Sequence, residues 1–371
     1  MDKFLLAHSA NKTHAELVDD CIKQLGDIPP ETTLGFVYVS DYLNEQMRPI
    51  LQALQTRTGI QHWVGTVGMG IIATKQEYYD QPALAVMLCD INEEDFRILP
   101  NIADSHAFSP ELEHWCSQHT FHVGLIHGGP ENPYFKANID EFAERIPEAF
   151  LVGGISSSRG MHYHVADSLQ QDGISGILFS DQVNIITNLS QGCSPIGTRH
   201  LITDAEDNVA LTLDHRPALD VLQEDTGDLI ARDWERASGF IFAGLMNKNS
   251  DSGDYTIRQL IGVDEHAKVF IISDNLEDQQ ELVFCRCDGI SAQDDLQHML
   301  MQVKSRLKKP PRGGIYVSCL GRGRVQFGAN SEEVRLVHSV LGDFPLVGFF
   351  ANGEIHKNQL YGFTGVLTLF L

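Results

Sequence analysis

The sequence predicts a mixed α/β fold, built from repeated β-α-β-β units whose sheets are flanked by helices. The 371 residues are 43% apolar and 21% charged, a composition typical of globular proteins. A chain of this length usually folds as about two domains, each large enough to bury a core. The prediction rests mainly on an internal repeat, in which strands, a helix and glycines recur three times in the same order.

Each unit opens with an apolar strand and continues through an amphipathic helix. A second strand then runs into glycine, and a third apolar strand closes the unit. In chain order the predicted segments are 34–40, 43–54, 63–70 and 83–89; 121–126, 139–146, 150–154 and 174–180; and 314–319, 331–342, 344–350 and 364–370. Ser331 is the predicted cap of the third helix.

Three glycines mark the same point in the three units. Gly65, Gly153 and Gly348 each follow a valine and lie about 30 residues beyond the first strand of their unit. We expect them at equivalent places at the end of a central strand. Glycine is favoured there because it permits a close backbone approach or a positive φ.

The residues between the second and third units follow a different pattern. A turn is predicted from Gly192 to Gly197, and Pro217 opens a helix. Predicted strands cover 184–189, 200–203, 209–213, 240–245, 257–263, 269–273 and 282–287, and a helix covers 291–309. A polar stretch over 225–233 predicts a boundary between two domains, residues 1–228 and 229–371.

Charge and cysteine usage narrow the classes of partner. The chain has 27 basic and 50 acidic side chains and a net charge of −23, so we expect neither nucleic acid nor anionic lipid as a partner. No apolar run is long enough for a signal peptide or for membrane insertion. The seven cysteines are scattered, which predicts reduced thiols in a cytoplasmic protein. Cys285 and Cys287 form half of a metal-binding pattern, but a second pair is missing, so no metal site is expected.

Several glycine-rich motifs resemble a known family. The segment 348–354 followed by 365–370 resembles the end of the C-terminal FIST domain, and 319–328 resembles its Gly-Arg-Gly segment. Residues 261–264 resemble a short phrase of the same domain, and 191–197 a motif late in the N-terminal FIST domain. The resemblance implies that 1–228 is the FIST N-terminal domain and 229–371 the FIST C-terminal domain.

The resemblance also implies a function. FIST proteins are regarded as sensory proteins that bind small ligands such as amino acids in signal transduction. We therefore expect a cytoplasmic sensor that binds an amino-acid-like metabolite. Because no output segment is recognised in the sequence, it is expected to signal through a separate protein such as a histidine kinase. No catalytic spacing is found, so an enzyme of unknown reaction ranks last.

Two charged residues are the main candidates for ligand binding. Arg322 lies between Gly321 and Gly323, where a guanidinium and free backbone N–H groups would suit a carboxylate. The alternative is a structural arginine that holds a turn or a neighbouring loop. Glu354 follows Asn352 and Gly353 after an apolar strand. Its carboxylate could bind a ligand ammonium, or it could be a structural acid that pairs with Arg322.

The motif at Gly192 and Cys193 is interpreted first as a turn and second as a possible ligand contact. Catalysis by Cys193 is not expected, because no nearby base would activate its thiol as a nucleophile. One branch of the family binds haem and responds to nitric oxide. This gives the alternative of a haem-binding sensor that regulates a histidine kinase. Haem would be held without covalent attachment, by His127 or by His162 or His164.

Overall fold

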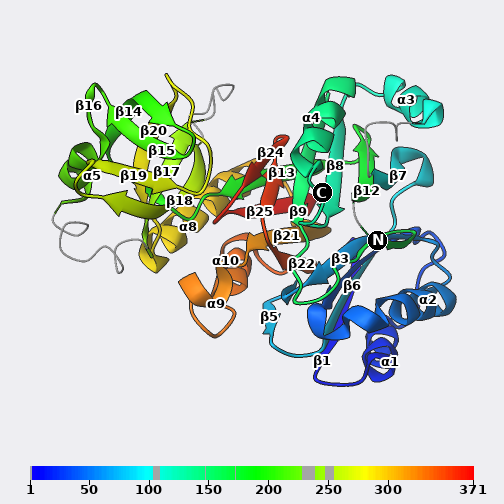
Figure 1. Ribbon diagram of the computed structural model, residues 1–371. Coiled ribbons are helices and arrows are strands. Elements are labelled where there is room, and N and C mark those ends of the chain that lie inside the picture. The colour runs from blue at the N-terminus through cyan, green and yellow to red at the C-terminus, as the bar shows by residue number, and fades with distance from the viewer. Residues whose placement is uncertain (1, 103–108, 147, 172, 228–238, 247–254) are drawn as a thin grey trace. The chain divides into compact units, whose positions relative to one another are not determined.

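The computed structural model describes residues 2–102, 109–146, 148–171, 173–227, 239–246 and 255–371 (Figure 1). The fold is mixed α/β, with several mixed sheets, one small barrel and flanking helices, as predicted. Two compact units are present, each made of separate stretches of chain. The first comprises Met1–Ser190, Gln297–Leu360 and Thr364–Leu371, and the second Gln191–Leu296 with Tyr361–Phe363. We call them the three-repeat body and the barrel unit. The predicted boundary between residues 228 and 229 lies outside the described residues.

Three repeats with one element order make up the body, and each begins before the predicted unit and ends with its closing strand. Repeat 1 comprises β1 (Leu5–Ala10), α1 (His14–Leu25), β2 (Leu34–Ser40), α2 (Met47–Thr58), β3 (His62–Gly68), β4 (Gly70–Ala73), β5 (Gln76–Tyr79) and β6 (Ala83–Cys89). Repeat 2 comprises β7 (Phe96–Ile102), α3 (Pro110–Ser117), β8 (His122–Gly128), α4 (Phe135–Arg145), β9 (Ala149–Ile155), β10 (His164–Ala166), β11 (Ser168–Gln170) and β12 (Ile174–Ser180).

Repeat 3 has the same order, with the barrel strands inserted after its first strand. It comprises β13 (Ile185–Ser190), α8 (Gly289–Arg306), β21 (Gly313–Cys319), α9 (Gly323–Gln326), α10 (Glu332–Leu341), β22 (Leu346–Ala351), β23 (Glu354–His356), β24 (Gln359–Tyr361) and β25 (Gly365–Phe370). Two 3₁₀ helices, η1 (Asp41–Gln46) and η2 (Glu93–Asp95), belong to the connections of repeats 1 and 2. In chain order α8 therefore corresponds to α1 and α3.

Strand pairing confirms the repeat. Within each repeat two strands run parallel, β2 with β3, β8 with β9 and β21 with β22. The closing strand, β6, β12 or β25, pairs antiparallel with the first of them. Such mixed sheets with both faces covered need apolar strands, and the burial of every residue of β2, β6, β8 and β12 agrees with this.

Each repeat also extends the sheet of another repeat with a short hairpin. The hairpin β10–β11 of repeat 2 pairs with β3 of repeat 1, and β23–β24 of repeat 3 pairs with β9 of repeat 2. The hairpin β4–β5 of repeat 1 pairs with β22 of repeat 3 and completes the cycle. Three six-stranded sheets result, related by an approximate three-fold arrangement.

The three glycines occupy equivalent positions, as predicted. Gly65 lies opposite Val37, Gly153 opposite Ile126 and Gly348 opposite Tyr316, each across a parallel pair of strands. A Cβ atom would lie 1.7 Å from the Val37 carbonyl oxygen, 2.0 Å from that of Ile126 and 1.8 Å from that of Tyr316. Only glycine allows this backbone approach. The prediction that they end the strand is wrong, because all three lie inside β3, β9 and β22.

The core of the body lies between the sheets and under the helices. Aromatic side chains of all three repeats meet at its centre, among them Phe36, Phe179, Phe349 and Phe370. A second cluster joins the first sheet to α1 and α2, and a third joins the second sheet to α3 and α4. The body is therefore layered, with α1 and α2 covering the first sheet and α3 and α4 the second.

The strands of the barrel unit were predicted, but their closure into a barrel was not. It contains β14 (Ser194–Glu206), β15 (Val209–Leu213), β16 (Arg216–Pro217), α5 (Ala218–Thr226), β17 (Ile241–Met246), β18 (Tyr255–Asp264), β19 (Val269–Ile272) and β20 (Glu281–Arg286). Antiparallel pairing follows the ring β14–β20–β17–β18–β19–β15 and closes from β15 to β14. The predicted turn at 192–197 is a register shift within the long β14, where Gly197 has φ 71. Glycine in a strand commonly marks such a bulge.

Candidate functional site

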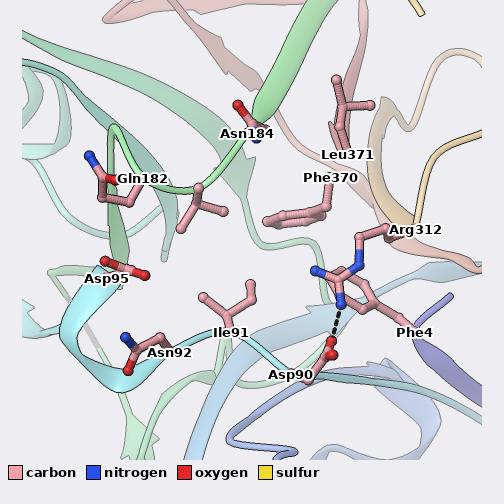
Figure 2. Close-up of a pocket in the computed structure, with 11 residues that line it drawn as sticks. Phe4, Asp90, Ile91, Asn92, Asp95, Gln182, Asn184, Arg312, Phe370 and Leu371 are labelled. Carbon is pink, nitrogen blue, oxygen red and sulfur yellow. Dashed lines mark hydrogen bonds and ion pairs between the residues drawn. The ribbon is translucent and has the colours of Figure 1, made fainter. Parts of the chain in front are cut away.

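A pocket of about 210 Å³ lies where the three repeats of the body meet (Figure 2). Its lining residues are Phe4, Asp90, Ile91, Asn92, Asp95, Gln182, Val183, Asn184, Arg312, Phe370 and Leu371. They come from the segments that follow the closing strands β6 and β12, from the end of β25, and from residues that precede β1 and β21. We call this cavity the axial pocket, because equivalent parts of all three repeats form it.

The repeat explains how these residues come together. Phe4, Asp95 and Asn184 directly precede the edge strands β1, β7 and β13, so they hold equivalent places in the three repeats. The three edge strands pair antiparallel with the closing strands. The pocket therefore has three-fold backbone geometry, but its side chains differ between repeats, which gives it an acidic, an amide and an aromatic portion.

An arginine ion pair forms one side of the axial pocket. The Arg312 guanidinium forms an ion pair with Asp90 and lies 4.8 Å from the centre of the Phe4 ring. Backbone hydrogen bonds hold the segment in place: Arg312 N–H donates to Phe370 O at 2.8 Å, and Phe4 N–H donates to Arg312 O at 2.8 Å. Asp95 lies on the side away from Arg312 (Figure 2). The pocket thus presents charges of both signs at separate places.

Sequence reasoning missed the axial pocket. Its charged residues, Asp90, Asp95 and Arg312, stand at strand ends outside any motif. A signal was nevertheless present, because Asp90 follows the predicted closing strand 83–89 and Arg312 precedes the predicted first strand 314–319. Aligning the three repeats to their ends would have indicated that these segments converge.

The predicted ligand residue Arg322 is completely buried and bound within the protein. Its Nε donates to Glu333 Oε1 at 2.8 Å, and the same carboxylate accepts from the Tyr316 hydroxyl at 2.7 Å and from Gly323 N–H at 2.9 Å. Ser190 O accepts a further bond at 3.4 Å. These contacts match the structural alternative, an arginine that ties β21 and α10 to the end of β13.

The second predicted ligand residue, Glu354, is also buried and lies in the same region. Its Oε2 accepts from Thr364 N–H at 3.1 Å and from the Thr364 hydroxyl at 2.8 Å. Burial raises the pKa of Glu354 to about 8, although those hydrogen bonds and the charge of Arg322 oppose the rise. The structure pairs Arg322 with Glu333 and Glu354 with Thr364.

The glycines and amide beside these residues shape the backbone. Gly323 has φ 52, and a Cβ there would lie 2.0 Å from the Tyr79 hydroxyl. Gly321 precedes Arg322 in the connection from β21 to α9. Asn352 N–H donates to Ile155 O, and Gly353 O accepts from Ile155 N–H, so the turn between β22 and β23 is bound to the end of β9.

Cys193 is bonded to Cys287, with their Cα atoms 4.2 Å apart. The expectation of reduced thiols is therefore wrong for this pair, although Cys21, Cys89, Cys116, Cys285 and Cys319 are free. The physical reason is strand register. Ser194 pairs with Arg286 across β14 and β20, so the residues just outside that pair face each other. Gly192, with φ 68, turns the chain into this pair.

Two of the histidines named as haem candidates, His127 and His164, do not fit a haem group. His127 is fully buried, with its ring 5.7 Å from that of Tyr38 and 5.6 Å from that of Phe349. Burial, with a smaller contribution from His164, lowers its pKa to about 3. His164 is fully buried as well, and its Nδ1 lies 2.5 Å from Ser175 Oγ. A porphyrin against either ring would have to displace the core.

The remaining haem candidate, His162, is half-buried. Its Nδ1 lies 2.5 Å from Glu131 Oε1, a contact that orients the ring and leaves Nε2 as the nitrogen that would bind a metal. Within the part of the chain that the structure describes, no three His, Cys, Asp or Glu side chains form a group that could hold a metal ion. No described helix is long and apolar enough to span a membrane.

Comparison with known proteins agrees with the sequence motifs. Residues 33–216 match the FIST N domain and residues 218–357 match the FIST C domain. An uncharacterized protein of Mycobacterium tuberculosis (strain ATCC 25618 / H37Rv) is 29% identical over 342 residues, which cover 88% of each chain. An uncharacterized protein of Mycobacterium bovis (strain ATCC BAA-935 / AF2122/97) is 28% identical over 323 residues, 83% of this chain and 82% of the relative.

The two domain matches follow each other in the expected order and together span most of the chain. FIST domains are associated with sensing in signal transduction. The chain therefore belongs to the FIST family, with a FIST N domain followed by a FIST C domain.

Proposed function

We propose that the protein is a small-molecule sensor that binds an amino-acid-like metabolite in the axial pocket and signals through a separate partner, such as a histidine kinase. The observation that carries the proposal is the axial pocket itself, where segments of all three repeats meet around charges of both signs. The cytoplasmic site of action in this proposal is supported by the five free cysteines, whereas the Cys193–Cys287 disulfide is a feature more common in oxidising compartments.

The size and lining of the pocket suit a small metabolite. A volume of about 210 Å³ holds a ligand of the size of an amino acid and excludes large cofactors. Phe4, Ile91 and Phe370 offer apolar contacts, and Arg312, Asp90 and Asp95 offer polar ones. Six of the eleven lining residues are polar or charged, namely Asp90, Asn92, Asp95, Gln182, Asn184 and Arg312, so the pocket suits a polar metabolite.

The position of the pocket supports a sensory role. A ligand there would contact residues of all three repeats, such as Asp95 of repeat 2 and Phe370 of repeat 3. Binding energy would then favour one arrangement of the repeats over others, which is the condition for a ligand to shift a conformational equilibrium.

The proposal is tested by ligand screening of the full chain. Thermal unfolding is measured with a panel of amino acids and related metabolites, and hits are titrated by calorimetry. In Val183→Phe a larger side chain fills the pocket, so the stabilisation by a true ligand is expected to disappear. Val325→Phe is the matched control, since Val325 is 76% exposed and lies outside the pocket. A ligand whose effect survives Val183→Phe would place the sensory site elsewhere.

A further inference from the structure

Asp95 differs from the other charged residues of the axial pocket. Asp90 and Arg312 neutralise each other, and their side chains are 10% and 23% exposed. The Asp95 carboxylate forms no ion pair or side-chain hydrogen bond with any residue that the structure describes. It is half-buried at the end of η2 and lines the cavity. The pocket therefore keeps one negative charge that a ligand can neutralise.

We propose that the axial pocket selects its ligand through a positively charged amino group, which binds to Asp95. This inference rests on the proposed function only for the use of the pocket, and it names the chemical class of the ligand. Small organic amines with an apolar body bind, and amino acids bind through the same ammonium group. Carboxylic acids that lack an amino group do not.

The neighbours of Asp95 suit an ammonium group. Asn92 and Gln182 line the pocket on the side away from Arg312, as Asp95 does (Figure 2). Side-chain amides offer carbonyl oxygens, and an ammonium group has three N–H donors, so one carboxylate and two amides can satisfy it. Hydrogen bonds between an ammonium and a carboxylate are among the stronger ones in proteins. The net charge of −23 further favours the approach of a cation.

A ligand carboxylate meets a less favourable site. Arg312 is the one basic side chain in the lining, and its guanidinium is bound to Asp90 and lies over Phe4. An incoming carboxylate would have to compete with Asp90 for it and would leave a partly buried aspartate without its partner. Such a loss costs more than a new exposed ion pair returns. Binding energy therefore comes from the ammonium group of the ligand and from its contacts with the apolar side chains of the lining.

Apolar side chains form a smaller part of the lining. Ile91, Val183 and Phe370 line the cavity together with Phe4, and Phe370 belongs to the central aromatic cluster of the body. A short aliphatic group on the ligand would contact these side chains next to the ammonium site. This gives a simple set of probes with one common side chain.

Three compounds separate the alternatives: 3-methylbutylamine, leucine and 4-methylpentanoate. They share a branched aliphatic chain and differ in which charged groups they carry. Calorimetric titration of the full chain at low salt is expected to give binding for the amine and for leucine and none for the acid. Asp95→Asn is expected to weaken amine binding by about tenfold, the loss of one hydrogen-bonded charge pair.

Glu93→Gln is the matched control, because Glu93 stands in the same 3₁₀ turn and loses the same charge but does not line the pocket. Its amine affinity is expected to equal that of the unmodified chain. Binding of the acid as tight as that of the amine would overturn the inference, and so would an amine affinity unchanged in Asp95→Asn. Absence of binding by all three compounds would overturn it too. The proposed function fails separately, when no metabolite of the wider panel stabilises the protein in a way that Val183→Phe abolishes.

Discussion

Substituting Gly65 by alanine tests whether the repeat rests on close backbone packing. A Cβ at this position would lie 1.7 Å from the carbonyl oxygen of Val37 and 2.7 Å from its carbonyl carbon. Both atoms belong to the backbone of β2, inside a sheet paired on both sides, so no side chain can rotate away to make room. The strands themselves must move apart.

The expected cost follows from this geometry. Overpacking a core typically costs about 1–3 kcal/mol, and a contact with immobile backbone places Gly65→Ala near the upper end, at about 3 kcal/mol. Gly348→Ala is expected to cost a similar amount, because its Cβ would lie 1.8 Å from Tyr316 O. Gly153→Ala adds the strain of φ 131 and is expected to lose at least as much.

Denaturant unfolding measures these losses as changes in the free energy of unfolding. Gly362→Ala is the control, since a Cβ there has no neighbour within 4 Å among the described atoms, and its stability is expected to change by less than about 0.5 kcal/mol. If Gly65→Ala proves as harmless as Gly362→Ala, the close approach of β3 to β2 is wrong, and with it the equivalence of the three repeats.

Four further predictions concern other parts of the molecule. His200 lies between Asp214 and Asp225 at 2.6 and 2.9 Å; burial alone would lower its pKa, but the two hydrogen bonds outweigh burial and raise it above 6.5. The charged imidazole therefore stabilises the fold below pH 6.5, and this contribution disappears as the pH rises through the raised pKa. His200→Gln is expected to lower the unfolding temperature at about pH 5.5 more than at about pH 8.5. An equal loss of unfolding temperature at both pH values would contradict the raised pKa. Arg322→Met leaves Glu333 buried without its partner and is expected to cost about 3–5 kcal/mol in denaturant unfolding, of which the double variant Arg322→Met/Glu333→Leu recovers a large part; an unaffected single variant would show that the pair is not buried. Thiol titration of the unfolded, non-reduced chain is expected to find five of seven cysteines reactive, whereas seven would rule out the Cys193–Cys287 bond. Any Soret band seen on addition of haem is expected to survive His127→Ala, because His127 is buried in the core; a band lost in that variant would show otherwise.

The strands of the repeat were predictable because burial on both sides demands continuous apolar runs. The segments 34–40 and 83–89 coincide with β2 and β6 for this reason. The hairpin exchange was not predictable, because a strand such as β10 has three residues and carries too little periodicity to indicate a partner in another repeat. The family resemblance, carried by glycine motifs in a fixed order, was correct.

The roles of the charged residues could not be predicted, because they depend on partners far away in the sequence. Glu333 lies in the first turn of α10, where it is buried and binds Arg322. Ser331 is the N-cap residue of α10, as predicted, but its hydroxyl makes no capping bond and accepts from Glu77 N–H instead. The axial pocket joins Phe4 to Leu371, and neither residue stands in a motif. Contacts between residues so far apart depend on how the sheets exchange hairpins.

The most direct test of the central claim is a crystal structure of the full chain with bound 3-methylbutylamine. The account predicts electron density for the amine in the axial pocket, with its nitrogen within hydrogen-bond distance of the Asp95 carboxylate and its branched end against Phe370. Density for the amine elsewhere in the protein, or in the pocket with the nitrogen directed away from Asp95, would contradict it.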